Sequence, residues 1–136
     1  MLVIGYGNTL RGDDGFGYRA AERIPGAIAV HQLTPELMEP ISKADRVLFL
    51  DASAEGAPGE VRRRRVVPSE GGAFTHHSTP EALLAGSLAL YGRCPEATLI
   101  TVTGVNFDVS ETLSPSVQTA LQEVLRVVSA FSATPR

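Results

Sequence analysis

The chain has 136 residues, a length that suits one domain over residues 1–136 and allows a buried core without disulfides. Its net charge of −3 gives no reason to expect nucleic acid or an anionic membrane as a partner. The single cysteine, Cys94, excludes an internal disulfide, and the apolar run at residues 1–5 is too short for a signal peptide or a membrane span. We therefore expect a cytoplasmic protein and a monomer.

The first elements follow from short apolar runs and their breakers. Residues 2–4 are apolar and are stopped by Gly5, which predicts a buried strand. Apolar residues then recur every four positions over 15–24, which predicts a helix that Pro25-Gly26 ends. Residues 27–33 are predicted to form the second strand.

Three further helices are marked by a hydroxyl residue followed by proline, at Thr34-Pro35, Thr79-Pro80 and Ser114-Pro115. The hydroxyl oxygen can cap the first turn, and proline is favoured at the first helical position because that N–H has no partner in the helix. The predicted helices span residues 35–42, 80–91 and 115–131. Ser78 with Glu81 offers an alternative capping box for the second of these.

Continuous apolar runs at residues 47–50 and 98–102 predict central strands covered by helices on both faces. Residues 59–67 predict another strand, but its four consecutive arginines, 62–65, leave no apolar face, so we place it at a sheet edge. Strands that alternate with helices predict an α/β fold of three layers with a mostly parallel sheet. The arginines are most simply a solvated edge that discourages aggregation, and the alternative is a docking patch for an acidic partner.

The loop at residues 5–17, GYGNTLRGDDGFG, holds five glycines and allows close backbone approach. A dinucleotide fingerprint would need its third glycine where Leu10 stands, and no phosphate-binding loop lysine follows. The loop instead delivers Asp13 and Asp14 just before a helix, where they would repel a phosphate and attract a cation. Capping of the helix is an equally good explanation for Asp13 and a weaker one for Asp14.

Two more segments supply candidate metal ligands. Asp51 ends a central strand, where α/β proteins place catalytic or binding groups, although it could simply form a turn. His76 and His77 precede the helix that begins at Pro80. One imidazole and two carboxylates are a suitable ligand set for a divalent transition metal that keeps open positions.

Other polar residues have simpler explanations. Cys94 lacks any pattern that would activate a thiol, and no serine stands in a nucleophile elbow, so a cysteine or serine hydrolase is not indicated. Gly7, Asn8 and His31 are candidates for lining the same cleft. Asn8 could equally serve the loop's own backbone, and His31 a capping role.

The glycine and acidic-pair motif of residues 5–17 resembles that of the hydrogenase maturation endopeptidase family. The resemblance continues through residues 31–37 (HQLTPEL), 50–52 (LDA), the segment around His77, and residues 102–115. It implies a twisted, mostly parallel five-stranded sheet between helices, of the phosphorylase/hydrolase-like kind. It also implies that Asp14, Asp51 and His77 contact nickel, with His77 preferred over His76.

The same resemblance implies an aspartyl endopeptidase-like hydrolase that removes the C-terminal extension of a nickel-loaded hydrogenase large-subunit precursor. The nickel would be supplied by that precursor, so no tightly bound metal of the enzyme's own is expected. Substrate would be contacted by Gly7, Asn8, Asp13, His31 and His76. Two alternatives remain: a non-catalytic nickel-handling or maturation-checkpoint module, and a hydrolase with a different substrate.

Overall fold

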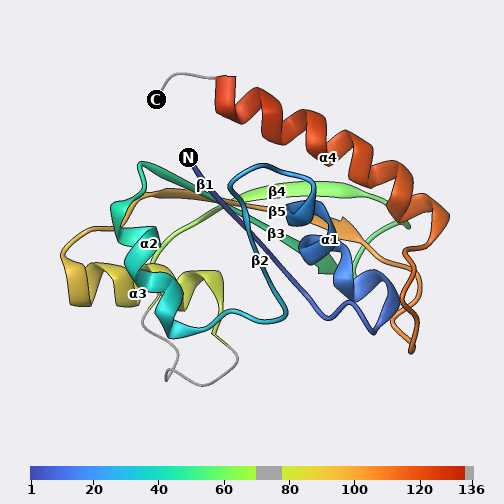
Figure 1. The fold of residues 1–136 in the computed structure, drawn as a ribbon, viewed down its shortest axis with the longest axis horizontal. Helices are drawn as coiled ribbons and strands as arrows, with labels where there is room; N and C mark the ends of the chain where they lie inside the picture. Colours follow the sequence, from blue (N-terminus) through green and yellow to red (C-terminus); the bar gives the residue numbers. More distant parts are fainter. Residues whose placement is uncertain (70–77, 134–136) are drawn as a thin grey trace.

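The computed structural model describes residues 1–69 and 78–133 as a five-stranded sheet with helices on both faces (Figure 1). In chain order, the elements are β1 (Leu2–Tyr6), the 3-10 turn η1 (Gly12–Gly15), α1 (Phe16–Glu22), β2 (Ile28–Val30), the 3-10 turn η2 (Pro35–Leu37), α2 (Met38–Lys43), β3 (Arg46–Ser53), β4 (Val61–Val66), α3 (Pro80–Tyr91), β5 (Glu96–Thr103) and α4 (Pro115–Ala133).

The strand order is β2-β1-β3-β5-β4. The first four strands in this order are parallel, and β4 pairs antiparallel with β5 at the edge. This arrangement confirms the predicted three-layer α/β fold, the mostly parallel sheet and the edge position of the arginine strand. Because parallel strands end on the same side, the carboxyl ends of β1, β2, β3 and β5 lie in one row, which we call the carboxyl edge of the sheet.

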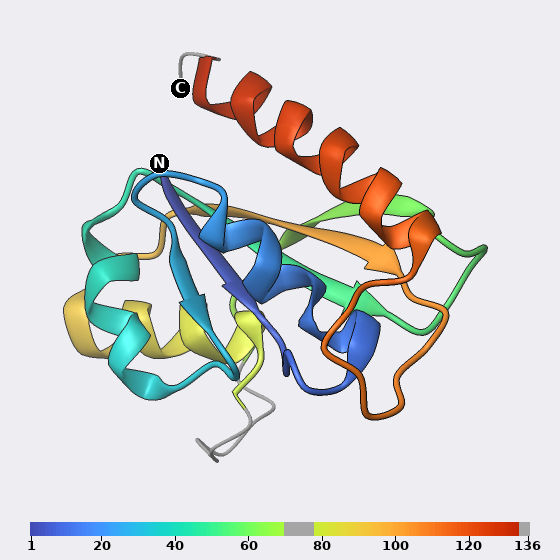
Figure 2. The same ribbon diagram turned by 45° about the vertical axis from the view of Figure 1, so that its right-hand side comes forward.

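The sheet separates two apolar cores. Helices α1 and α4 cover one face, and α2 and α3 cover the other (Figures 1 and 2). Alternate residues of β3 enter opposite cores: Leu48 and Leu50 pack towards α1 and α4, whereas Val47 and Phe49 pack towards α2 and α3. The uninterrupted apolar run in the sequence therefore reflects burial on both sides. None of the described helices is long and apolar enough to cross a membrane.

The hydroxyl-proline pairs lie where the helical segments start, but the hydroxyl side chains make different hydrogen bonds. The Thr79 hydroxyl caps α3 as predicted, accepting a bond from the Ala82 N–H at 3.1 Å. Thr34 does not cap its helix: its hydroxyl donates to Glu36, and the segment starts as a 3-10 turn. The second strand is also shorter than predicted, since β2 ends at Val30.

The arginines of β4 are matched locally by charge or by an aromatic ring. Arg62 and Arg64 pair with Glu60 and Glu81, the latter at 2.7 Å, and the Arg65 pair with Glu96 is looser at 4.0 Å. These side chains are exposed, and exposed ion pairs add little stability. A charged open edge nevertheless discourages pairing with another chain, and docking of an acidic partner there remains a prediction.

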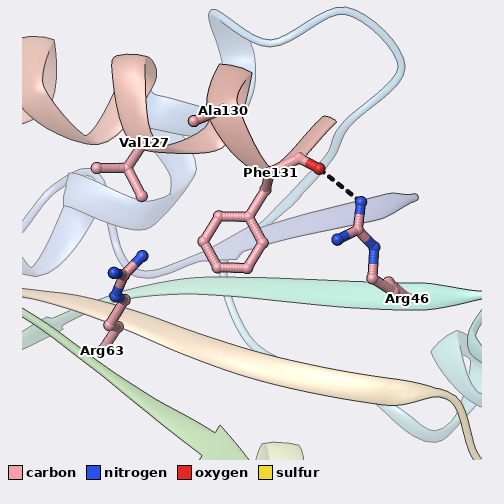
Figure 3. Close-up of a pocket in the computed structure, with 5 residues that line it drawn as sticks. All are labelled: Arg46, Arg63, Val127, Ala130 and Phe131. Carbon is pink, nitrogen blue, oxygen red and sulfur yellow. Dashed lines mark hydrogen bonds between the residues drawn. The ribbon is translucent and has the colours of Figure 1, made fainter. Parts of the chain in front are cut away.

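The C-terminal end of α4 is fastened to the sheet by two arginines (Figure 3). Arg46, the first residue of β3, donates to the backbone carbonyl of Phe131, and the Arg63 guanidinium lies 5.8 Å from the centre of the Phe131 ring. With Val127 and Ala130 they surround a hollow of about 300 Å³. Arg46 begins β3 and Asp51 lies near its end, so this hollow is remote from Asp51.

We expect Leu84→Ala to lower the free energy of unfolding by about 2–5 kcal/mol, because the Leu84 side chain is 0% exposed and a cavity would remain. Leu90→Ala on the same helix is the matched control, since Leu90 is 69% exposed and should change stability by less than about 0.5 kcal/mol. Urea unfolding measures both. Equal losses in the two variants would contradict the placement of α3.

Candidate active site

Close backbone packing brings the glycine loop onto the ends of β1 and β3. Gly7 has φ +151°, and a Cβ there would lie 1.9 Å from the carbonyl oxygen of Asp14. A Cβ on Gly17 would lie 2.2 Å from the Leu50 carbonyl oxygen and 2.5 Å from that of Tyr6. No larger residue fits at either place without displacing backbone. The glycines therefore allow Asp14 to sit beside the strand end that carries Asp51.

Asp13 is fully buried and serves the protein's own backbone. Its carboxylate accepts bonds from the N–H groups of Val105 at 2.7 Å, Asn106 at 3.0 Å and Ser114 at 2.7 Å, and from the Ser114 hydroxyl at 2.7 Å. Burial alone would raise the pKa of Asp13, but these bonds outweigh it and lower the pKa below its ordinary value. The structure thus gives Asp13 a structural task, and its contact with substrate stays a prediction.

That task is to hold the long connection between β5 and α4 against the glycine loop. The two segments lie side by side (Figure 2), and further backbone bonds join them, from Asp13 N–H to Asn106 and from Gly12 N–H to Ser110, both at 2.8 Å. The Ser114 hydroxyl, predicted as a helix cap, donates to Asp13. The loop that carries Asp14 is therefore supported from a segment about ninety residues away in sequence.

Asp14 is only partly buried, and its carboxylate accepts one bond from the described residues, from the Asn8 N–H at 2.9 Å. Asn8 in turn uses its side-chain oxygen to accept from the Leu10 N–H at 2.9 Å. The Asn8 side chain thus shapes the loop, which is the simpler of the two explanations that its sequence position allowed. With one donor in the part of the chain that the structure describes, this carboxylate keeps lone pairs for other ligands.

Asp51 lies near the carboxyl end of β3, as predicted, and is partly buried. Burial raises its pKa to about 7; bonds from the Ala52 N–H, at 2.8 Å, and from the Tyr6 side chain oppose this rise, while the charge of Asp14 adds to it. The influence of Asp14 shows that the two acids lie within electrostatic reach of each other. Asp14 and Asp51 therefore lie near each other, and their role as ligands stays a prediction.

Tyr6 is a site residue that the sequence analysis missed. Its phenol is bonded to the Asp51 carboxylate, and burial together with the charge of Asp51 raises the pKa of Tyr6. A signal was present: Tyr6 ends the first strand and Asp51 closes the apolar run of the third. In the parallel register Gly5 pairs with Leu50, so the next residues of the two strands, Tyr6 and Asp51, lie side by side.

Of the three histidines, the structure describes the surroundings of His31 alone. His31 is exposed just beyond β2, with its Nε2 3.5 Å from the Thr9 hydroxyl and its ring edge-on to Tyr18 at 5.1 Å between centroids. It therefore flanks the glycine loop. His76 and His77 lie outside the described residues, so the third predicted ligand stays a prediction. Within residues 1–69 and 78–133, no three acidic, histidine or cysteine side chains form a metal-binding group.

A hollow of about 400 Å³ adjoins Asp51 on the side of β5 and β4. Its lining includes Ala52, the neighbour of Asp51 in the chain, and Thr101, the partner of Asp51 in the β3–β5 register. Ser53 and Arg62 also line it. A volume of this size can receive a few side chains of a bound peptide.

Several solved structures of hydrogenase maturation proteases share this architecture. A hydrogenase 2 maturation peptidase from a Thaumarchaeota archaeon is 26% identical, with TM-score 0.70 and coverage of 98% of each chain. The hydrogenase maturating endopeptidase HybD of E. coli is 23% identical, with TM-score 0.73 over 95% of this chain and 89% of that one. The nickel–iron hydrogenase maturation protease HycI of Thermococcus kodakarensis is 22% identical, with TM-score 0.74 over 98% and 92%.

This chain has the fold of the hydrogenase maturation endopeptidases. The agreement spans nearly the whole length of both partners in each comparison, so the fold implied by the motif resemblance is confirmed. No protein-family model matches the chain, and no curated protein sequence does. In this fold the glycine loop, Asp14 and Asp51 all lie at the carboxyl edge of the parallel strands, where open α/β sheets bind their ligands.

We expect the Asp51 carboxyl group to titrate near pH 7. Its side-chain ¹³C NMR signal, recorded as a function of pH, measures this. Asp14→Asn should move the midpoint down, because it removes a neighbouring negative charge, and Tyr6→Phe should move it up, because it removes a donor. The folded protein holds the Asp51 proton more tightly than the unfolded chain does. The contribution of Asp51 to the free energy of unfolding should therefore decrease as the pH rises from 3.8, the ordinary pKa, to about 7, the pKa in the folded protein. A midpoint below about 5 would contradict the assignment.

Asp13→Asn should lower the free energy of unfolding by about 3 kcal/mol at neutral pH, because an amide N–H₂ would face the backbone donors that the carboxylate now satisfies. Because the pKa of Asp13 is lowered in the folded protein, its carboxylate stabilises the fold fully above pH 3.8, the ordinary pKa, and this stabilisation is lost as the pH falls through the lowered pKa. The difference in free energy of unfolding between the wild type and Asp13→Asn should therefore become smaller in acid. Asp108→Asn, on the exposed part of the same connection, is the control for denaturant unfolding. Equal effects of both variants would contradict the structural role of Asp13.

Proposed function

We propose that this chain is an endopeptidase that removes the C-terminal extension of the nickel-loaded large-subunit precursor of a nickel–iron hydrogenase. One observation carries the proposal: Asp14 and Asp51 lie within electrostatic reach of each other at the carboxyl edge of a sheet whose fold is that of solved hydrogenase maturation proteases. His77 is the third member of the proposed ligand set. The precursor brings the nickel, and the protein holds no metal tightly of its own.

The chemistry of the two acids fits this use. Among the described residues, the Asp14 carboxylate accepts a bond only from the Asn8 N–H, so it keeps lone pairs for a cation. Asp51, with a pKa of about 7, can give up its proton near neutral pH when a cation binds. Nickel held between the precursor and these side chains would polarise the scissile carbonyl or a water molecule. When the Asp51 carboxylate is not bound to the metal, its pKa near 7 also suits it to accept a proton from that water molecule.

Substrate contacts are proposed around this centre. The hollow beside Asp51 offers room for the residues next to the cleaved bond. Gly7, Asn8 and His31 border the glycine loop, and His76 precedes the proposed ligand His77. The partner is the large-subunit precursor, without nucleic acid or membrane, and we propose that the protein acts as a cytoplasmic monomer.

Incubation with nickel-loaded and nickel-free precursor, followed by intact-mass measurement, tests the proposal. We expect loss of a defined C-terminal peptide from the loaded form alone. Binding of the loaded precursor with unchanged mass would instead identify a non-catalytic checkpoint module. Processing that ignores nickel would point to a hydrolase of another specificity.

Three substitutions should each abolish processing while leaving the fold intact: Asp14→Asn, Asp51→Asn and His77→Ala. Each removes a proposed nickel ligand, and circular dichroism monitors the fold. Asp45→Asn is a matched control, because Asp45 is exposed and directly precedes β3, at the opposite end of the strand from Asp51. Retained processing by one of the three variants would remove that residue from the site.

A further inference from the structure

The hydroxyl group of Tyr6 has no place in the predicted ligand set, yet it contacts one of the ligands directly. The Tyr6 ring is partly buried and packs against the core that α2 and α3 cover. A phenylalanine would fill the same space, so packing explains the ring but not the hydroxyl. A phenol that leaves water needs a hydrogen-bond partner. Tyr6 and Asp51 lie side by side at the ends of β1 and β3, where Gly5 pairs with Leu50, and the Asp51 carboxylate is the group with which the Tyr6 side chain interacts.

This contact changes how Asp51 is held. A carboxylate offers about four lone-pair positions, and in Asp51 the Ala52 N–H and the Tyr6 hydroxyl each use one. Two donors from different strands fix the plane of the carboxylate as well as its position. The Asp14 carboxylate, by contrast, has one donor within residues 1–69 and 78–133, the Asn8 N–H. Asp51 is thus the more firmly oriented of the two acids before any metal arrives.

We propose that Tyr6 is a positioning residue that orients the Asp51 carboxylate towards the nickel of the precursor. The inference rests on the proposed function, because it assigns Tyr6 a role in that same site. Partners that hydrogen-bond a metal ligand from behind hold it in the productive rotamer, and their loss commonly lowers metal affinity about 10–100-fold. Tyr6 does not touch the metal itself and acts only through Asp51.

Tyr6→Phe removes the hydroxyl and keeps the ring, so it separates positioning from packing. We expect the variant to bind Ni²⁺ alone about 10–100-fold more weakly than the wild type in calorimetric titration, with an unchanged circular dichroism spectrum. Tyr91→Phe is the control, because Tyr91 is 47% exposed at the end of α3 and should bind Ni²⁺ like the wild type. With nickel-loaded precursor, Tyr6→Phe should raise KM more than it lowers kcat.

A double-mutant cycle shows whether Tyr6 acts through Asp51. In the Asp51→Asn background, adding Tyr6→Phe should change Ni²⁺ affinity less than about twofold, because the side chain that Tyr6 positions is already altered. A full additional loss in that background would overturn the proposal. So would wild-type Ni²⁺ affinity in Tyr6→Phe, or a wild type that does not bind Ni²⁺.

The same measurements distinguish this inference from the proposed function. If Tyr6→Phe weakens Ni²⁺ binding but the wild type processes no precursor, the peptidase assignment fails and the role of Tyr6 stands. If the wild type processes the precursor and Tyr6→Phe alters neither Ni²⁺ affinity nor KM, the role of Tyr6 fails and the peptidase assignment stands.

Discussion

The approach of the glycine loop to the ends of β1 and β3 determines the rest of the candidate site. Gly7 and Gly17 leave no room for a Cβ, because carbonyl oxygens of Asp14, Leu50 and Tyr6 occupy that space. This closeness brings a carboxylate from the loop within electrostatic reach of a carboxylate on β3. Burial is the main cause of the raised pKa of Asp51, and repulsion by the neighbouring charge of Asp14 adds to the rise. A cation shared by both acids would relieve that repulsion, which is the physical basis of the proposed nickel recognition.

Two adjacent aspartates have opposite surroundings in this loop. Asp13 turns inward, where four donors satisfy its carboxylate and tie the β5–α4 connection to the loop. Asp14 accepts a bond from the Asn8 N–H, its one donor among the residues described, and remains partly exposed. The buried acid supplies rigidity, and that rigidity holds its neighbour in place. An electrostatic site built on a loop gains accuracy when the loop is itself anchored.

The sequence predicted those features that depend on local patterns. Apolar runs identified β3 and β5, the hydroxyl-proline pairs located three helix starts, and the arginine block indicated an edge strand, since each signal lies within a few residues. The position of Asp51 followed from the rule that parallel strands carry functional groups at their carboxyl ends. The prediction was wrong about the Thr34 cap, because the hydroxyl can bond nearby Glu36 instead of the helix backbone.

The features that the sequence did not reveal depend on register and on distant segments. Tyr6 meets Asp51 because β1 and β3 pair with Gly5 opposite Leu50, and no local pattern encodes that pairing. The role of Asp13 depends on donors about ninety to a hundred residues away, at Val105, Asn106 and Ser114. From the sequence alone, capping and function were both open for this residue. Only the packed structure separates the tasks of Asp13 and Asp14.

The central claim is that Asp14 and Asp51 share one metal ion with His77. A crystal soaked with nickel and measured at the nickel absorption edge tests it most directly. The account predicts one anomalous peak with carboxylate oxygens of Asp14 and Asp51 and a ring nitrogen of His77 about 2.0–2.2 Å away, distances typical of divalent transition metals such as zinc. A peak bound by other side chains, with these three residues remote from it, would contradict the account.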